Sequence, residues 1–158
     1  MPVLISSCLL GIACRYDGGH SRVAEIIAKA QDLHFIPVCP EQLGGLPTPR
    51  DSVTILGGDG RAVLAGQAQV INSSGKDVTA AFLKGARETL RLAQITGATT
   101  ALMKNRSPSC GLATPYCETD TGYGPGVTAA LLTSAGIRVI EIDPETIKKG
   151  FIEELGLL

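Results

Sequence analysis

At 158 residues, the chain is close to the usual size of one folded domain, and its 44% hydrophobic residues are enough for one sizeable core. Fourteen Lys and Arg nearly balance fifteen Asp and Glu, so charge gives no sign of a nucleic-acid partner or an anionic membrane surface. Because the N-terminus has no basic flank and no long apolar stretch occurs, we expect a soluble, unexported, cytoplasmic protein without a membrane partner.

The first part of the chain contains two predicted strands, each of which ends at a cysteine. Residues 3–7 form a short apolar run rich in strand formers that ends at Cys8, and a loop with several glycines follows. The spacing of apolar residues over 21–32 is typical of a helix. Residues 33–38 then predict the second strand, which ends at Cys39.

A glycine-rich turn indicates a small antiparallel insertion after these elements. Residues 53–56 and 61–64 are short runs of mostly apolar residues, Val-Thr-Ile-Leu and Arg-Ala-Val-Leu, and residues 57–60 between them read Gly-Gly-Asp-Gly. Two apolar runs about such a turn are typical of a β-hairpin. We therefore expect both runs to be strands.

The remainder of the chain alternates helices and strands. Caps, prolines at helix starts and glycines at helix ends set the expected bounds. The expected elements are a helix over 77–96, a strand over 98–103, a loop over 104–123, a helix over 125–136, a strand over 137–142 and a last helix over 143–156. Strands separated by crossover helices form a mostly parallel sheet with helices on both faces. The predicted fold is a single three-layer, Rossmann-like α/β domain over residues 1–158, with the hairpin as an insertion.

Three of the five cysteines follow predicted strands of this sheet. Cys8 and Cys39 end the first two strands, and Cys110 lies in the loop after the strand over 98–103. Ligands of such sheets bind at the carboxyl ends of the strands, so topology alone places these three thiols at one edge. A cysteine taken alone is as well explained as a small core residue. Their shared position instead favours a common metal site.

The spacing of the cysteines argues against a structural zinc site, which usually contains a close pair such as C-x₂₋₄-C. Five residues separate Cys8 from Cys14, and six separate Cys110 from Cys117. Thiolates from well-separated loops suit an iron–sulfur cluster, which is larger and needs no such spacing. A thiol–disulfide enzyme is disfavoured because no C-x-x-C sequence occurs.

Five ordered motifs carry a resemblance to a known family. They are SCLLG at 7–11, CRYDG at 14–18, PVCPE at 37–41 with LGGLPTPR at 43–50, SPSCG at 107–111 and GPGVTAALL at 124–132. Together they resemble the thiouracil desulfidase family over roughly residues 3 to 142. The resemblance implies a [4Fe–4S] cluster held by three cysteines, with a fourth iron free to take sulfur from a thiolated nucleobase such as 2-thiouracil. Matched motif by motif, Cys8, Cys39 and Cys110 are the implied ligands.

The implied reaction needs a group that moves a proton. Water adds to the thiocarbonyl carbon, the C–S bond breaks and hydrosulfide leaves, with no net redox change. Glu41, two residues from Cys39, is the expected acid–base group, although a solvated loop carboxylate is the alternative. Ser107 and Ser109 flank Pro108, and either hydroxyl is expected to orient the water or to bond the base unless both serve the turn.

The motifs leave the role of Cys14, the role of residues 122–126 and the exact function undecided. Cys14 as a fourth ligand would close the cluster and remove the proposed chemistry. Residues 122–126, ahead of a helix, offer N–H groups for an anion or the edge of a heterocycle. The competing hypothesis is a nucleobase- or nucleotide-binding or redox-sensing module whose cluster is structural. The motifs do not separate free thiouracil from another thiolated base or a thionucleotide, and they do not give the oligomeric state.

Overall fold

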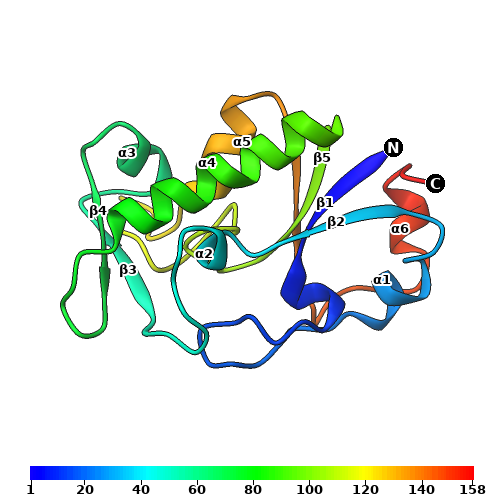
Figure 1. The fold of residues 1–158 in the computed structure, drawn as a ribbon, viewed down its shortest axis with the longest axis horizontal. Coiled ribbons are helices and arrows are strands. Elements are labelled where there is room, and N and C mark those ends of the chain that lie inside the picture. Colours follow the sequence, from blue (N-terminus) through cyan, green and yellow to red (C-terminus); the bar gives the residue numbers. More distant parts are fainter.

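The computed structural model describes residues 1–158 and contains a four-stranded sheet, a two-stranded hairpin and six α-helices (Figure 1). The sheet has the order β2-β1-β5-β6, and all of its neighbouring strands are parallel. Its strands are β1 (Pro2–Ser6), β2 (His34–Val38), β5 (Thr100–Lys104) and β6 (Arg138–Ile142). The predicted parallel sheet is therefore confirmed. None of the helices combines the length and the apolar character needed to cross a bilayer.

Side chains alternate between the two faces of the sheet and so build two separate layers of core. Val3 and Ile5 of β1 belong to a cluster that includes Ile152 of α6 (Phe151–Glu154), on the face where α1 (Ala24–Ala28) also lies. Leu4, between them, packs with residues of α4 (Thr79–Thr96) and α5 (Val127–Ser134) on the opposite face. Helices thus cover both faces, as the three-layer prediction requires (Figure 1).

The hairpin is present, but the prediction of its second strand was wrong. β3 (Val53–Leu56) pairs antiparallel with β4 (Gln69–Asn72), whereas residues 61–64 lie in a short helix, α3 (Gly60–Leu64). The cause is Asp59, whose Oδ1 accepts hydrogen bonds from the N–H groups of Arg61 at 2.9 Å and Ala62 at 3.3 Å. A side chain that caps two free N–H groups starts a helix there.

Two further helices are shorter than predicted. The helix predicted over 21–32 is limited to α1, because after it the N–H groups of Lys29 and Ala30 bond only three residues back, to Ile26 and Ile27. Ahead of it, the N–H groups of Ser21 and Val23 bond to the carbonyls of Cys8 and Leu9. In the segment over 143–156, Asp143 caps only a turn, and the α-helix is limited to α6, after Gly150 in a left-handed conformation. A short helix that the sequence did not predict, α2 (Pro40–Leu43), follows β2 directly.

Candidate active site

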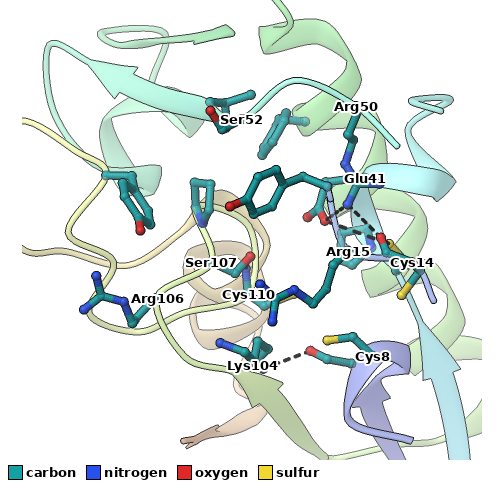
Figure 2. A pocket seen from close by; sticks show the side chains of 18 of the residues that line it. Cys8, Cys14, Arg15, Glu41, Arg50, Ser52, Lys104, Arg106, Ser107 and Cys110 are labelled. Atoms are coloured by element: carbon teal, nitrogen blue, oxygen red, sulfur yellow. Dashed lines mark hydrogen bonds and ion pairs between the residues drawn. The ribbon is translucent and has the colours of Figure 1, made fainter. Parts of the chain in front are cut away.

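The three predicted thiols line one cavity of about 480 Å³ at the carboxyl ends of β1, β2 and β5. Figure 2 shows this cavity and labels Cys8 and Cys110. Cys8 lies in a 3₁₀ turn directly after β1, Cys39 is the N-cap residue of α2, and Cys110 lies in the loop after β5. All three are buried. The expected convergence at one edge of the sheet is therefore present.

The loop that carries Cys110 is held in place from two sides. Ser107 Oγ accepts hydrogen bonds from the N–H groups of Ser109 and Cys110, at 3.2 and 3.0 Å. The N–H groups of Gly126, Val127 and Ala129 at the start of α5 donate to the carbonyls of Gly111, Pro108 and Ser109. These donors therefore hold the loop of Cys110. The structure does not support the anion site expected ahead of this helix, since Gly126, within residues 122–126, already uses its N–H group in this way.

The helix that carries Cys39 and Glu41 rests against α4 through two glycines. A Cβ atom on Gly44 would overlap the carbonyl of Ala81, and one on Gly85 would overlap the carbonyl of Pro40. The backbones of α2 and α4 therefore touch directly. Because this contact leaves no room for a methyl group, it fixes how far Cys39 and Glu41 reach into the cavity.

The thiols in the cavity are close enough to affect one another. A hydrogen bond with Cys39 lowers the pKa of Cys14, but a hydrogen bond with Cys8 and burial outweigh it and raise the pKa to about 11. The hydrogen bond with Cys14, followed by burial, raises the pKa of Cys39. Burial, followed by the charge of Glu41, raises the pKa of Cys110, against hydrogen bonds from Ser6 and Ser107. Cys14, Cys39 and Cys110 are therefore protonated at neutral pH, and binding a metal group as thiolates would release protons.

Glu41 lines the same cavity and is bound on one side only. Its Oε2 accepts a hydrogen bond from Arg50 Nη2 at 2.9 Å, and the Cys39 sulfur lies 3.8 Å from the same oxygen. Oε1 is buried and has no hydrogen-bond partner. A buried acceptor without a partner costs about 1–3 kcal/mol, so this atom indicates a place where a ligand or water contacts the protein.

Of the two predicted serines, the structure brings only Ser107 into the cavity. Ser109 is 1% exposed, and its Oγ lies 3.5 Å from Thr128 Oγ1 of α5. The expectation that either hydroxyl faces the substrate is therefore corrected for Ser109, because the turn around Pro108 directs its side chain toward the helix.

Positively charged side chains that the sequence did not single out also line the cavity. Lys104, at the end of β5, donates from Nζ to the carbonyl and the Oδ1 of Asn105, and burial lowers its pKa. Arg106 has a left-handed backbone, with φ at 63°, and its guanidinium lies 5.8 Å from the ring of Tyr116. Their position after a predicted strand was the available signal.

Residues of the CRYDG motif also line the cavity. Cys14, Arg15 and Tyr16 line it, whereas Asp17 accepts a hydrogen bond from the N–H of Gly19 and shapes the turn. Cys117 lies elsewhere, buried in the core of the hairpin. The cavity therefore contains four of the five cysteines of the chain.

This donor set fits an iron–sulfur cluster better than a single metal ion. No three His, Cys, Asp or Glu side chains lie close enough together to hold one ion. Cys8, Cys39 and Cys110 instead surround a cavity from three separate loops, and cysteine thiolates are the usual ligands of iron–sulfur clusters.

Comparison with known proteins agrees with this site. Residues 3–143 match the family model described as 2-thiouracil desulfurase. The chain belongs to the 2-thiouracil desulfurase family. One relative in this comparison is the uncharacterized protein YbbK of Bacillus subtilis (strain 168), which is 45% identical over 141 residues, or 87% of this chain and 93% of YbbK.

A solved structure shares the fold of this desulfurase-family chain. It is described as the [4Fe-4S]-dependent thiouracil desulfidase TudS, and it is 34% identical, with a TM-score of 0.78. The similarity covers 99% of each chain. The resemblance seen in the sequence motifs and the predicted α/β fold are thereby confirmed.

Proposed function

We propose that this chain removes sulfur from a thiolated nucleobase such as 2-thiouracil and releases hydrosulfide, with a [4Fe–4S] cluster as its cofactor. The observation that carries the proposal is the joint placement of Cys8, Cys39, Cys110 and Glu41 around one cavity, in a chain of the 2-thiouracil desulfurase family. The cofactor and reaction named for TudS support it. The cavity of about 480 Å³ lies within the range of roughly 300–1,000 Å³ that is usual for small-molecule sites.

Cys8, Cys39 and Cys110 would hold the cluster. When bound, a cluster with three protein ligands supplies one iron that acts as a Lewis acid toward a thiocarbonyl sulfur. Lys104 lies near Cys8 and Cys110, so its charge offsets the negative charge that thiolate ligands bring into a buried site.

Glu41 moves the proton. Water supplies the oxygen of the product, the C–S bond breaks and no electrons are transferred overall, so only protons must be relocated. Oε1 is the carboxylate oxygen without a partner, and we assign it to accept the proton of the attacking water and return it on the leaving side. Ser107 orients the water or hydrogen-bonds the base, whereas Ser109 is not given a role in the cavity.

The test is an anaerobic assay of the chain after reconstitution with iron and sulfide. Hydrosulfide release is followed on 2-thiouracil, on other thiolated bases and on a thionucleotide. We expect release of one hydrosulfide per base converted, without added reductant or oxidant. The cluster-free chain is the control and is expected to release none.

Two results would overturn the proposal. A cluster-loaded chain that binds thiolated bases without releasing hydrosulfide would favour the binding or redox-sensing alternative. A reaction that stops unless an electron donor is supplied would contradict the non-redox chemistry.

A further inference from the structure

Arg50 joins the loop after α2 to the segments that carry two of the cavity cysteines (Figure 2). Its Nη2 donates to Glu41 Oε2 and to the carbonyl of Cys14, both at 2.9 Å. Its Nη1 donates to Thr48 Oγ1 at 3.0 Å and to the carbonyl of Pro47 at 3.2 Å. The guanidinium is therefore anchored by both of its terminal nitrogens, and its plane is fixed.

This anchoring decides which oxygen of Glu41 is free. The side chains of Arg50 and Glu41 are only 8% and 14% exposed, so little water competes for their hydrogen bond. Oε2 is occupied by Arg50 and approached by the Cys39 sulfur, whereas Oε1 has no partner. A carboxylate held by one oxygen from one side cannot turn without breaking a charge-assisted hydrogen bond.

We propose that Arg50 is a positioning residue that holds Glu41 by Oε2 and thereby presents Oε1 to the substrate. The inference rests on the proposed function, in which Glu41 moves a proton. In this role Arg50 acts through Glu41 rather than on the substrate or the reacting atoms. Displacing a reacting group by about 1 Å can cost roughly a hundredfold in rate, which sets the size of the expected effect.

The experiment compares four variants of the cluster-loaded, full-length chain: Arg50→Ala, Glu41→Gln, the double variant and Arg61→Ala. Arg61 is the matched control, since it forms an ion pair at 2.7 Å with Asp59 away from the cavity. Iron content, kcat and KM for 2-thiouracil are measured on the same preparations. We expect Arg50→Ala to retain iron and KM while kcat falls on the order of a hundredfold. Arg61→Ala should match the unmodified chain.

The double variant tests whether Arg50 works through Glu41. If it does, adding Arg50→Ala to Glu41→Gln lowers kcat little further. Equal losses in both backgrounds would overturn the proposal. Full activity of Glu41→Gln would instead remove Glu41 from the proposed function, and the two failures are thus distinguishable.

Guanidinium ion gives a second, independent measurement. Added to Arg50→Ala, it should occupy the vacated space and restore part of kcat, but not in the double variant. Crystal structures of Arg50→Ala should show the Glu41 carboxylate turned away without guanidinium and back in place with it. An unchanged carboxylate would overturn the proposal.

Arg50→Lys covers the case in which Arg50→Ala does not load the cluster. One ammonium cannot be anchored to Thr48 and Glu41 as the two guanidinium nitrogens are, so kcat should fall about tenfold or more with KM unchanged. Unchanged kcat in Arg50→Lys would refute the positioning role.

Discussion

Two regions of the molecule are built from the same parts but use them differently. Each contains a short helix, a carboxylate near its start, an arginine paired to that carboxylate and a buried cysteine. In the hairpin region, Asp59 accepts two backbone N–H groups on Oδ1 and Arg61 on Oδ2, so both oxygens are satisfied. In the cavity region, Glu41 is satisfied on Oε2 alone.

The difference shows how to separate a structural carboxylate from a chemical one. Burial alone raises the pKa of Asp59, but hydrogen bonds from Arg61 and from the N–H groups of α3 outweigh it, and the pKa is lowered. That carboxylate is held charged to start a helix, and its arginine is 74% exposed. The pair of Arg50 and Glu41 is buried on both sides and leaves one buried acceptor, Oε1, without a partner. The number of unpaired acceptors, rather than the presence of an ion pair, distinguishes the two.

The largest contrast is expected between the cysteines of the two regions. Cys39→Ser should abolish cluster retention, as should Cys8→Ser and Cys110→Ser, because each residue is one of only three thiolates in the proposed ligand set. Cys117→Ser, in the core of the hairpin, should leave iron and sulfide content unchanged. Iron and sulfide analysis after anaerobic reconstitution decides this. A full cluster in any of the first three variants would remove that residue from the ligand set.

The two carboxylates provide the next contrast. Glu41→Gln keeps the shape of the side chain but removes the proposed proton-transferring group, so kcat should fall about 10²- to 10⁴-fold with the cluster intact. Asp59→Asn keeps a good helix cap and should leave kcat within a few-fold. Hydrosulfide release and iron content are measured on the same samples. If Glu41→Gln loses the cluster, Glu41 is a structural neighbour of Cys39 and its proton-transfer role is withdrawn.

A smaller effect is expected where α2 touches α4. Replacing glycine by alanine within a helix usually stabilises it by roughly 0.5–1 kcal/mol. At Gly85 the added methyl group meets the carbonyl of Pro40, so Gly85→Ala should instead destabilise the chain by about 1–3 kcal/mol and weaken cluster retention. Lys84→Ala, on the exposed side of the same helix, is the control. A urea midpoint for Gly85→Ala at or above that of the unmodified chain would show that α2 moves aside freely.

The smallest effect concerns pH in the cluster-free chain. The pKa of Cys14 is raised from 9.0 to about 11, so the folded chain keeps this thiol protonated where the unfolded chain ionises it. The resulting stability is complete below pH 9.0 and is lost between pH 9.0 and about 11. Urea unfolding across this range should show a decline that Cys14→Ser reduces more than Cys117→Ser does. Equal slopes for both variants would contradict the interaction among the cavity thiols.

Most of the sheet could be predicted from the sequence because its strands are short apolar runs between turns. The alternation of strands and helices also placed Cys8, Cys39 and Cys110 together without knowledge of any side-chain contact. The error at residues 61–64 arose because a run of four mostly apolar residues suits a strand and a helix equally. The carboxylate of Asp59 caps this segment and makes it a helix, and the direction of that carboxylate depends on the turn before it.

The parts of the site that the sequence did not reveal depend on loop geometry. Glu41 and Arg50 are nine residues apart across a proline-rich loop, and only the folded path of that loop brings their charges to 2.9 Å. Ser107 and Ser109 are equivalent in the sequence, but Ser107 lines the cavity with its Oγ bonded to the N–H groups of Ser109 and Cys110, whereas the Oγ of Ser109 lies beside Thr128 of α5. Which side chain lies at the cavity is set by tertiary contacts rather than by the local sequence pattern.

The order of the strands along the chain also determines when the proposed ligands come together during synthesis. Two of the proposed ligands, Cys8 and Cys39, leave the ribosome early, whereas Cys110 follows β5 and its loop is held by the N–H groups of α5. Contacts between residues so distant in sequence form late. The cavity is therefore complete only after about four fifths of the chain has been synthesised, well after the segments that carry Cys8 and Cys39.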